Sequence, residues 1–177
     1  SGGLHVVGDF NSGGFADILS GTFILFGDGS GDFSRSPRRP YLPVGVGVPR
    51  AIATMDIDTD GDLDLIVSPS GRAAAVYALL NPGDGVFSGA VPVKLNGVEA
   101  RLTVVMATTD VNGDGLPDLV MGNADGNAQA WVNPAGTAAA TDGSSTVFDF
   151  PSSEGVTDIA LADMDADGLT GDLILAI

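Results

Sequence analysis

The sequence contains no cysteine, one histidine and only two glutamates among its 177 residues. Without cysteine, no disulfide contributes to stability, and the sequence does not indicate in which redox compartment the protein resides. Nucleophilic catalysis needs a base beside the nucleophile. The one histidine, His5, stands in an apolar stretch without a partner motif, so we expect it to be structural. We therefore expect no enzymatic activity from this chain.

Basic residues and long apolar runs are also scarce. No hydrophobic stretch approaches the ~18 residues that a membrane-spanning helix needs, so we expect no membrane span. Seven basic residues against 23 acidic ones give a net charge of −16. Such a chain would repel phosphates, which excludes nucleic acid as a partner.

Aspartate at alternate positions is the dominant feature of the sequence. In residues 108–120, side-chain oxygens fall at Asp110, Asn112 and Asp114, then Gly115 follows and Asp118 closes a nine-residue loop. Calcium prefers six to eight oxygen ligands, which short acidic side chains on a tight loop can supply. Gly115 can adopt a positive φ angle, so the backbone can fold around an ion. The pattern predicts a calcium site.

This loop recurs three more times along the chain. The fullest copy contains Asp56, Asp58, Asp60 and Asp64. The last copy contains Asp163, Asp165 and Asp167, with Asp172 one residue late. The first copy contains Asp9, Asn11 and Asp17. It is the weakest, because Gly13 stands at the third alternate position, where the other copies have an aspartate. The first aspartates are 47, 54 and 53 residues apart, and a period near fifty indicates a repeat architecture.

The loops have two alternative interpretations. An EF-hand loop places a bidentate glutamate at its twelfth position, whereas these loops have Ser20, Val67, Met121 and Ile174 there. Turns rich in Asp, Asn and Gly also form without binding an ion. Turn chemistry alone does not demand alternate acids in four copies, although for the first loop both interpretations stay open.

The segments around the loops predict an all-β fold. Apolar and β-branched runs precede and follow each loop. In each complete unit a third such run follows, and then a turn leads to Phe33, Phe87 or Phe148, which we expect to anchor a fourth strand. Four strands per unit at this period fit the blades of a β-propeller. We expect a single propeller segment of about three and a half blades, with units near 1–48, 49–100, 101–154 and, in part, 155–177.

The run Asp-x-Asp-x-Asp-Gly-x-x-Asp-Leu, followed by a strand and an Asn-Pro-Gly-Asp-Gly-x-Phe turn, resembles the FG-GAP/VCBS repeats of integrin α-type propellers. The resemblance implies calcium in the loop between the first two strands of each blade. By position, it implies that the backbone carbonyls of Asp62, Leu116 and Leu169 bind calcium. It also implies ligation by the side chains of the second and third loops, which are Asp56, Asp58, Asp60, Asp64, Asp110, Asn112, Asp114 and Asp118. Similar proteins are extracellular or cell-surface proteins that act in adhesion, ligand binding or scaffolding.

The ends of the array leave two alternatives open. An unpaired strand at Leu173–Ile177 would be a template for pairing with another chain. Either the sequence is a fragment, or a protein partner or second copy completes the structure through the open propeller ends. The arginine-rich segment 34–50 is interpreted either as an exposed connector or as a docking segment for an acidic partner.

We therefore expect a non-catalytic, calcium-binding propeller module for extracellular adhesion or structural assembly, including a filament or larger scaffold. The alternative is an accessory or sugar-binding propeller domain of a larger secreted enzyme. The sequence argues against glycan binding, because few aromatic side chains are suited to stacking on sugars. They are Trp131, Tyr41 and Tyr77.

Overall fold

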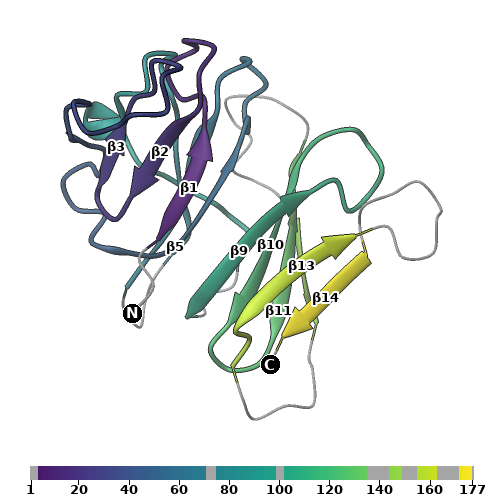
Figure 1. Ribbon diagram of the computed structural model, residues 1–177. Helices are drawn as coiled ribbons and strands as arrows, with labels where there is room; N and C mark the ends of the chain where they lie inside the picture. The colour runs from purple at the N-terminus through teal and green to yellow at the C-terminus, as the bar shows by residue number, and fades with distance from the viewer. Residues whose placement is uncertain are drawn as a thin grey trace.

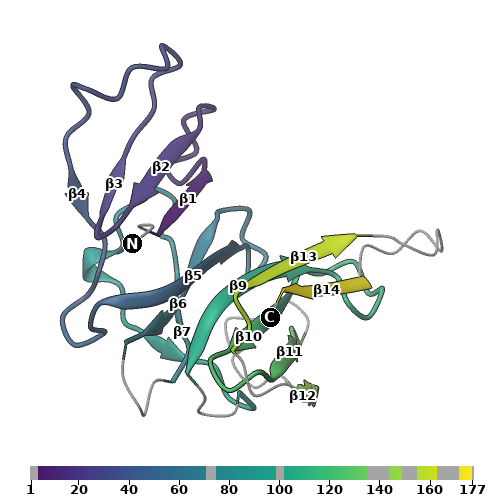
Figure 2. The same cartoon turned by 60° about the horizontal axis from the view of Figure 1, so that its bottom comes forward.

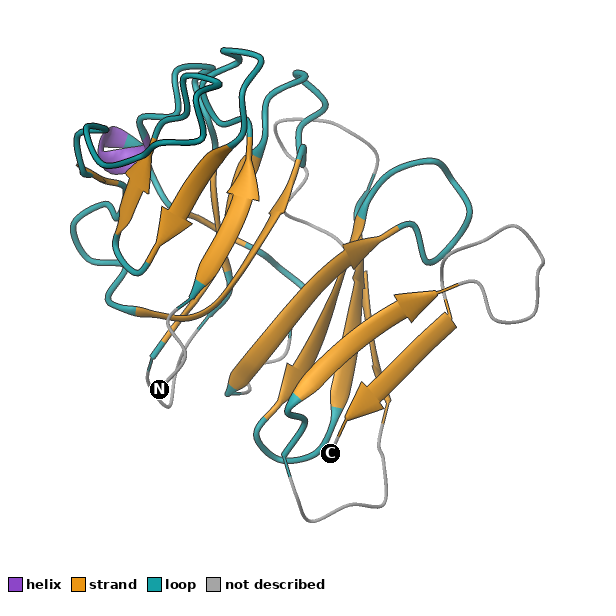
Figure 3. Ribbon diagram, viewed as in Figure 1, coloured by secondary structure: helices purple, strands orange, loops and turns teal. Residues whose placement is uncertain are grey.

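The computed structural model describes residues 4–70, 75–98, 102–134, 144–148, 155–162 and 172–176. Strands and loops make up nearly all of these residues, with one short 3₁₀ turn at Phe87–Gly89 (Figure 3). The all-β prediction is confirmed. Among the described residues, no helix has the length and apolar character needed to cross a membrane.

Three four-stranded antiparallel sheets follow one another along the chain (Figure 1). The first sheet contains β1 (His5–Gly8), β2 (Asp17–Ser20), β3 (Phe23–Leu25) and β4 (Arg39–Pro40). The second contains β5 (Pro49–Met55), β6 (Asp64–Pro69), β7 (Tyr77–Leu79) and β8 (Val93–Lys94). The third contains β9 (Thr103–Thr109), β10 (Asp118–Asn123), β11 (Ala128–Val132) and β12 (Ser144–Phe148). A final pair contains β13 (Asp158–Ala162) and β14 (Asp172–Ala176).

Each strand pairs with its neighbour in sequence, so every sheet is a simple meander. The first strands of consecutive sheets lie side by side: β1 is next to β5, β5 next to β9, and β9 next to β13 (Figures 1 and 2). The described strands close no ring, so the number of blades stays a prediction.

The core fills the spaces between consecutive sheets. One buried cluster lies between the first and second sheets and includes Leu19, Ile24, Leu65 and Leu79. A second cluster lies between the second and third sheets and includes Ile66, Met121 and Trp131. The second strands β6 and β10 are buried along their whole length, which explains the apolar runs at residues 65–67 and 119–121 within them.

The fourth strands differ from the sequence expectation. Phe33 and Phe87 were expected to anchor them, but β4 begins at Arg39 and β8 at Val93. Phe87 instead enters the 3₁₀ turn and is fully buried. In the third sheet the expectation holds, since Phe148 ends β12.

Candidate metal centre

The three described acidic loops occupy equivalent places in the fold. Each connects the first and second strands of its sheet, as the sequence predicts: β1 to β2, β5 to β6, and β9 to β10. The strand before each loop ends at the residue immediately before the loop's first aspartate. The glycines that follow the third alternate position in the second and third loops, Gly61 and Gly115, have φ angles of 96° and 87°. The predicted backbone reversal is therefore present.

The first aspartate of each loop organises the loop backbone. In the second loop, Asp56 Oδ1 accepts the N–H of Asp60 at 3.1 Å, and Oδ2 accepts that of Gly61 at 3.0 Å. In the third loop, Asp110 Oδ2 accepts the N–H of Gly115 at 2.7 Å. Hydrogen bonds from backbone N–H groups, the Gly115 bond foremost, lower the pKa of Asp110. The loop thus holds this side chain as a carboxylate.

The last aspartate of each loop has a structural role that the sequence did not reveal. Asp64 is fully buried, and its two oxygens accept N–H groups from Ile57 at 3.0 Å and Asn81 at 2.7 Å. This carboxylate therefore ties the loop to the end of β7. The same pair of bonds recurs at Asp17 and Asp118, which are also fully buried.

The second loop brings three carboxylates together. Asp56, Asp58 and Asp64 each place one oxygen within 4.8 Å of the other two. Burial raises the pKa of Asp64 to about 7, and the nearby charges of Asp58 and Asp60 add to the increase. Burial and the neighbouring charge of Asp60 also raise the pKa of Asp58. These three acids form an all-oxygen cluster whose repulsion a cation would relieve.

Asp60 and Asp62 lie outside this three-carboxylate cluster. Asp60 Oδ1 accepts the N–H of Asp62 at 2.9 Å, which tightens the loop locally. The side chain of Asp62 accepts the hydroxyl of Ser12 at 2.6 Å, so it connects the second loop to the first. The backbone carbonyl of Asp62 stays a predicted ligand.

The third loop has an amide where the second has an acid. Asn112 Nδ2 donates to Asp114 Oδ2 at 2.8 Å, and Asn112 Oδ1 accepts the N–H of Asp114. Burial raises the pKa of Asp118, with the charges of Asp114 and Asp110 adding to it. Among the described residues this loop forms no three-carboxylate cluster, so ligation here, including the carbonyl of Leu116, stays a prediction.

The first loop matches its weaker sequence. Gly13 provides no side-chain oxygen, and its N–H donates to both Asp9 and Asn11. Asp9 also accepts the N–H of Gly14 at 2.7 Å. The loop keeps the common hydrogen-bond pattern with fewer acidic groups.

The fourth loop lies outside the described residues, together with its proposed ligands Asp163, Asp165, Asp167 and Leu169. Asp172 is described only as the first residue of β14, where it pairs with Ala162. The predictions for this loop stay predictions.

The fold and the loops define an all-β repeat protein in which each of the three four-stranded antiparallel sheets carries an acidic loop between its first two strands. Comparison with known families agrees with this class, because residues 110–170 match the family model of the FG-GAP-like repeat. This match confirms the resemblance inferred from the sequence. No curated protein and no solved structure shows a significant match to the chain.

Proposed function

We propose that the chain is a non-catalytic, calcium-stabilised β-propeller module that acts outside the cell in adhesion or structural assembly. The observation that carries the proposal is the convergence of Asp56, Asp58 and Asp64 within 4.8 Å. Holding three carboxylates so closely, with Asp64 buried and Asp56 and Asp58 partly exposed, is costly unless a cation neutralises them.

The chemistry of the cluster favours calcium over softer metals. Every proposed donor is an oxygen, which suits a hard cation. The loop also contains backbone carbonyls and admits water, so it can reach a high coordination number. Extracellular sites of this kind bind at about 10⁻⁴–10⁻³ M, a range that matches calcium levels outside cells.

The charge of the whole chain supports the same conclusion. The side chains proposed for the four loops carry 2, 4, 3 and 4 negative charges, 13 in total, against a net charge of −16. Four calcium ions would add eight positive charges and halve the net charge to −8. Reduced self-repulsion stabilises the compact state.

Calcium removal tests the proposal. Thermal unfolding in millimolar calcium and in excess chelator should show a lower Tm with chelator, because an ion that binds only the folded state stabilises it. The variant Asp58→Asn should lose most of the calcium response of the second loop. The matched control is Asp84→Asn, an exposed aspartate outside the acidic loops. Its side chain accepts the backbone N–H of the residue two positions later, as the side chain of Asp58 does. An unchanged Tm in chelator would refute calcium stabilisation.

A further inference from the structure

A hollow of about 350 Å³ lies between the first and second sheets, at the strand ends away from the acidic loops. On the first sheet it is lined by Leu4, just before β1, and by the turn at residues 21–22. On the second sheet it is lined by residues 48–50, where β5 begins, and by Ser70, which follows β6. Both β1 and β5 run from this end of the sheets toward their acidic loops (Figure 1). No acidic residue is among these lining residues, so the hollow is separate from the candidate metal centre.

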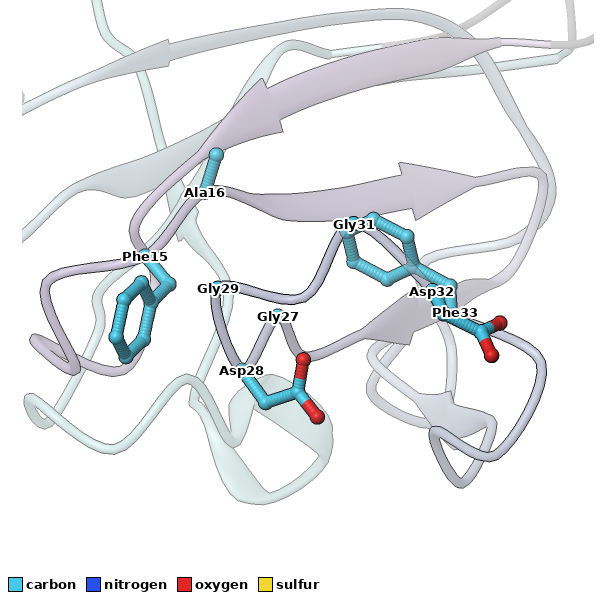
Figure 4. Close-up of a pocket in the computed structure, with 8 residues that line it drawn as sticks. All are labelled: Phe15, Ala16, Gly27, Asp28, Gly29, Gly31, Asp32 and Phe33. Carbon is cyan, nitrogen blue, oxygen red and sulfur yellow. The ribbon is translucent and has the colours of Figure 1, made fainter.

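Another hollow lies on the first sheet alone, where the rings of Phe15 and Phe33 lie on either side of a glycine-rich turn (Figure 4). Its lining residues all belong to that sheet, and nothing in the structure shows what covers them. The hollow at the junction is different, because two neighbouring sheets form it and its two sides face each other.

A short turn leaves the hollow at the junction open. Residues 21–22 join β2 to β3, whereas the longer connection of residues 124–127 joins β10 to β11 in the third sheet. That longer connection touches the linker to β13, since a Cβ added at Gly155 would lie 2.9 Å from the carbonyl oxygen of Ala124. Val48 is the counterpart of Gly155, because each stands eight residues before the first aspartate of the next loop. Beside Val48 the corresponding space is the hollow.

The two junctions also differ in their hydrogen bonds. The N–H of Val156, in the linker to β13, donates to the carbonyl oxygen of Asn123 at 3.1 Å. Pro49 stands at the position of Val156 in the linker to β5, and proline has no N–H to donate. Within the described residues, Thr22 of the short turn makes no hydrogen bond. Its hydroxyl and backbone groups are therefore available to a ligand in the hollow.

Arg50 supplies the charge of the hollow. It is exposed and forms no ion pair with the described part of a chain that contains 23 acidic residues. A guanidinium group presents a planar fork of N–H donors that fits a carboxylate. Leu4, Pro49 and Val48, which is 64% exposed, provide apolar surface in the same hollow. A carboxylate with apolar groups beside it matches this lining in charge and in polarity.

We propose that this hollow binds an acidic side chain on an extended segment of a partner protein. Arg50 binds the carboxylate, the hydroxyl groups of Thr22 and Ser70 provide further hydrogen bonds, and apolar neighbours of the acid pack against Val48. The lining favours a peptide over a sulfated polysaccharide, because it contains a single cation and no aromatic ring for stacking on a sugar. The proposal rests on the adhesion role proposed above and names its surface and the chemical class of its partner.

Titration with a pentapeptide tests the site on the 177-residue chain in calcium and roughly 0.15 M salt. The probe is Gly-Val-Glu-Val-Gly with both termini blocked, so its only charge is the central carboxylate. In ¹⁵N NMR spectra, the amide signals of Thr22, Val48 and Ser70 should shift and saturate. The matched peptide with Gln at its centre should bind about tenfold or more weakly, because the charge-assisted hydrogen bonds to Arg50 are lost.

Two pairs of variants test the residues of the hollow. Arg50→Gln should weaken binding of the Glu peptide by about tenfold or more, whereas Arg35→Gln, at an exposed arginine outside the hollow, should leave it unchanged. Val48→Asp places a competing carboxylate beside Arg50 and should weaken binding by a similar factor. Val91→Asp adds the same charge outside the hollow, at a position 79% exposed, and should bind like the unmodified chain. Both valines are exposed, so folding tolerates the changes.

Saturable binding that needs both the carboxylate and Arg50 would support the proposal. No saturable shift with the Glu peptide, equal binding of the Gln peptide, or binding unchanged by Arg50→Gln would overturn it. Tighter, Arg50-dependent binding of heparin than of the Glu peptide would also overturn it, in favour of a sulfated polysaccharide. The decrease in Tm on adding chelator should be the same in Arg50→Gln as in the unmodified chain. Failure of peptide binding with an intact calcium response would therefore refute this site alone, and the reverse result would refute calcium stabilisation alone.

Discussion

The indole N–H of Trp131 donates to the backbone carbonyl of Asn96 at 2.9 Å. This bond joins β11 of the third sheet to the turn after β8 of the second sheet. Trp131 is fully buried in the cluster between these sheets, so the hydrogen bond fixes a large apolar side chain in one orientation. Packing between sheets therefore includes a directional contact.

Replacing Trp131 with Phe should destabilise the protein by about 2 kcal/mol, because the hydrogen bond is lost and the smaller ring leaves space. Urea unfolding monitored by circular dichroism measures the change. Tyr77→Phe is the control: its hydroxyl makes no hydrogen bond within the described residues, so its loss should cost less than about 0.5 kcal/mol. Equal effects of the two substitutions would contradict the role of the indole N–H.

Gly13→Asp should increase calcium affinity in the first loop, because it restores the acid present as Asp60 in the second loop. The φ angle of Gly13 is not in the left-handed region, so aspartate fits the backbone. The added Cβ would lie 2.6 Å from Asn11 Oδ1, and that side-chain end must move. Titration calorimetry measures the affinity.

Gly14→Asp is the matched control for the first loop. It adds the same charge at a residue whose φ is 79°, a conformation that aspartate tolerates less well. It should not strengthen binding. Equal gains from both variants would show that net charge, rather than the alternate spacing of ligands, determines affinity.

Gly122→Ala should destabilise the contact between the third sheet and the segment that leads to β13. An added Cβ would lie 2.5 Å from a methyl group of Val156 and 2.8 Å from one of Val105. Overpacking of this kind costs about 1–3 kcal/mol. Gly89→Ala is the control, since nothing lies within 4 Å of its added Cβ. A smaller loss at Gly122 than at Gly89, measured by chemical denaturation, would contradict this packing.

The burial of Tyr41 leads us to expect a lower Tm at alkaline pH. Burial raises the pKa of Tyr41 above its ordinary value of 10.0, so the folded protein favours the neutral phenol. Its stabilising effect is complete below about pH 10 and is lost as the pH rises toward the folded-state pKa. The decrease in Tm between neutral and alkaline pH should be smaller in Tyr41→Phe.

At neutral pH, the same Tyr41→Phe variant should be less stable by about 1 kcal/mol, because the Tyr41 hydroxyl donates to the carbonyl oxygen of Gly21 at 3.0 Å. Parallel Tm curves for the two proteins across the alkaline range would rule out Tyr41 as the titrating group.

Local sequence was sufficient to predict the strand pairs around the acidic loops. Apolar runs on both sides of an Asp/Gly-rich turn specify a hairpin, and β5 with β6 and β9 with β10 confirm it. The alternate acids predicted one ligand set of Asp56, Asp58, Asp60 and Asp64, and the structure brings three of these together, without Asp60.

Long-range partners could not be read from the same pattern. The second partner of Asp64 is the N–H of Asn81, 17 residues away, whose position depends on where β7 ends. Phe87 was expected to anchor a fourth strand, but its partner Phe10 lies in the loop of the first sheet, in a distant part of the sequence. A local motif carries no information about such contacts.

The pairing of every strand with its sequence neighbour has a consequence for how the chain acquires its structure. Each sheet is built from strands that are consecutive in the chain, so its pairing needs no strand from later in the sequence. During synthesis, one sheet can assemble before the strands of the next leave the ribosome. Each new sheet then finds the surface against which it packs already present on the preceding sheet, so structure grows from the amino terminus one unit at a time.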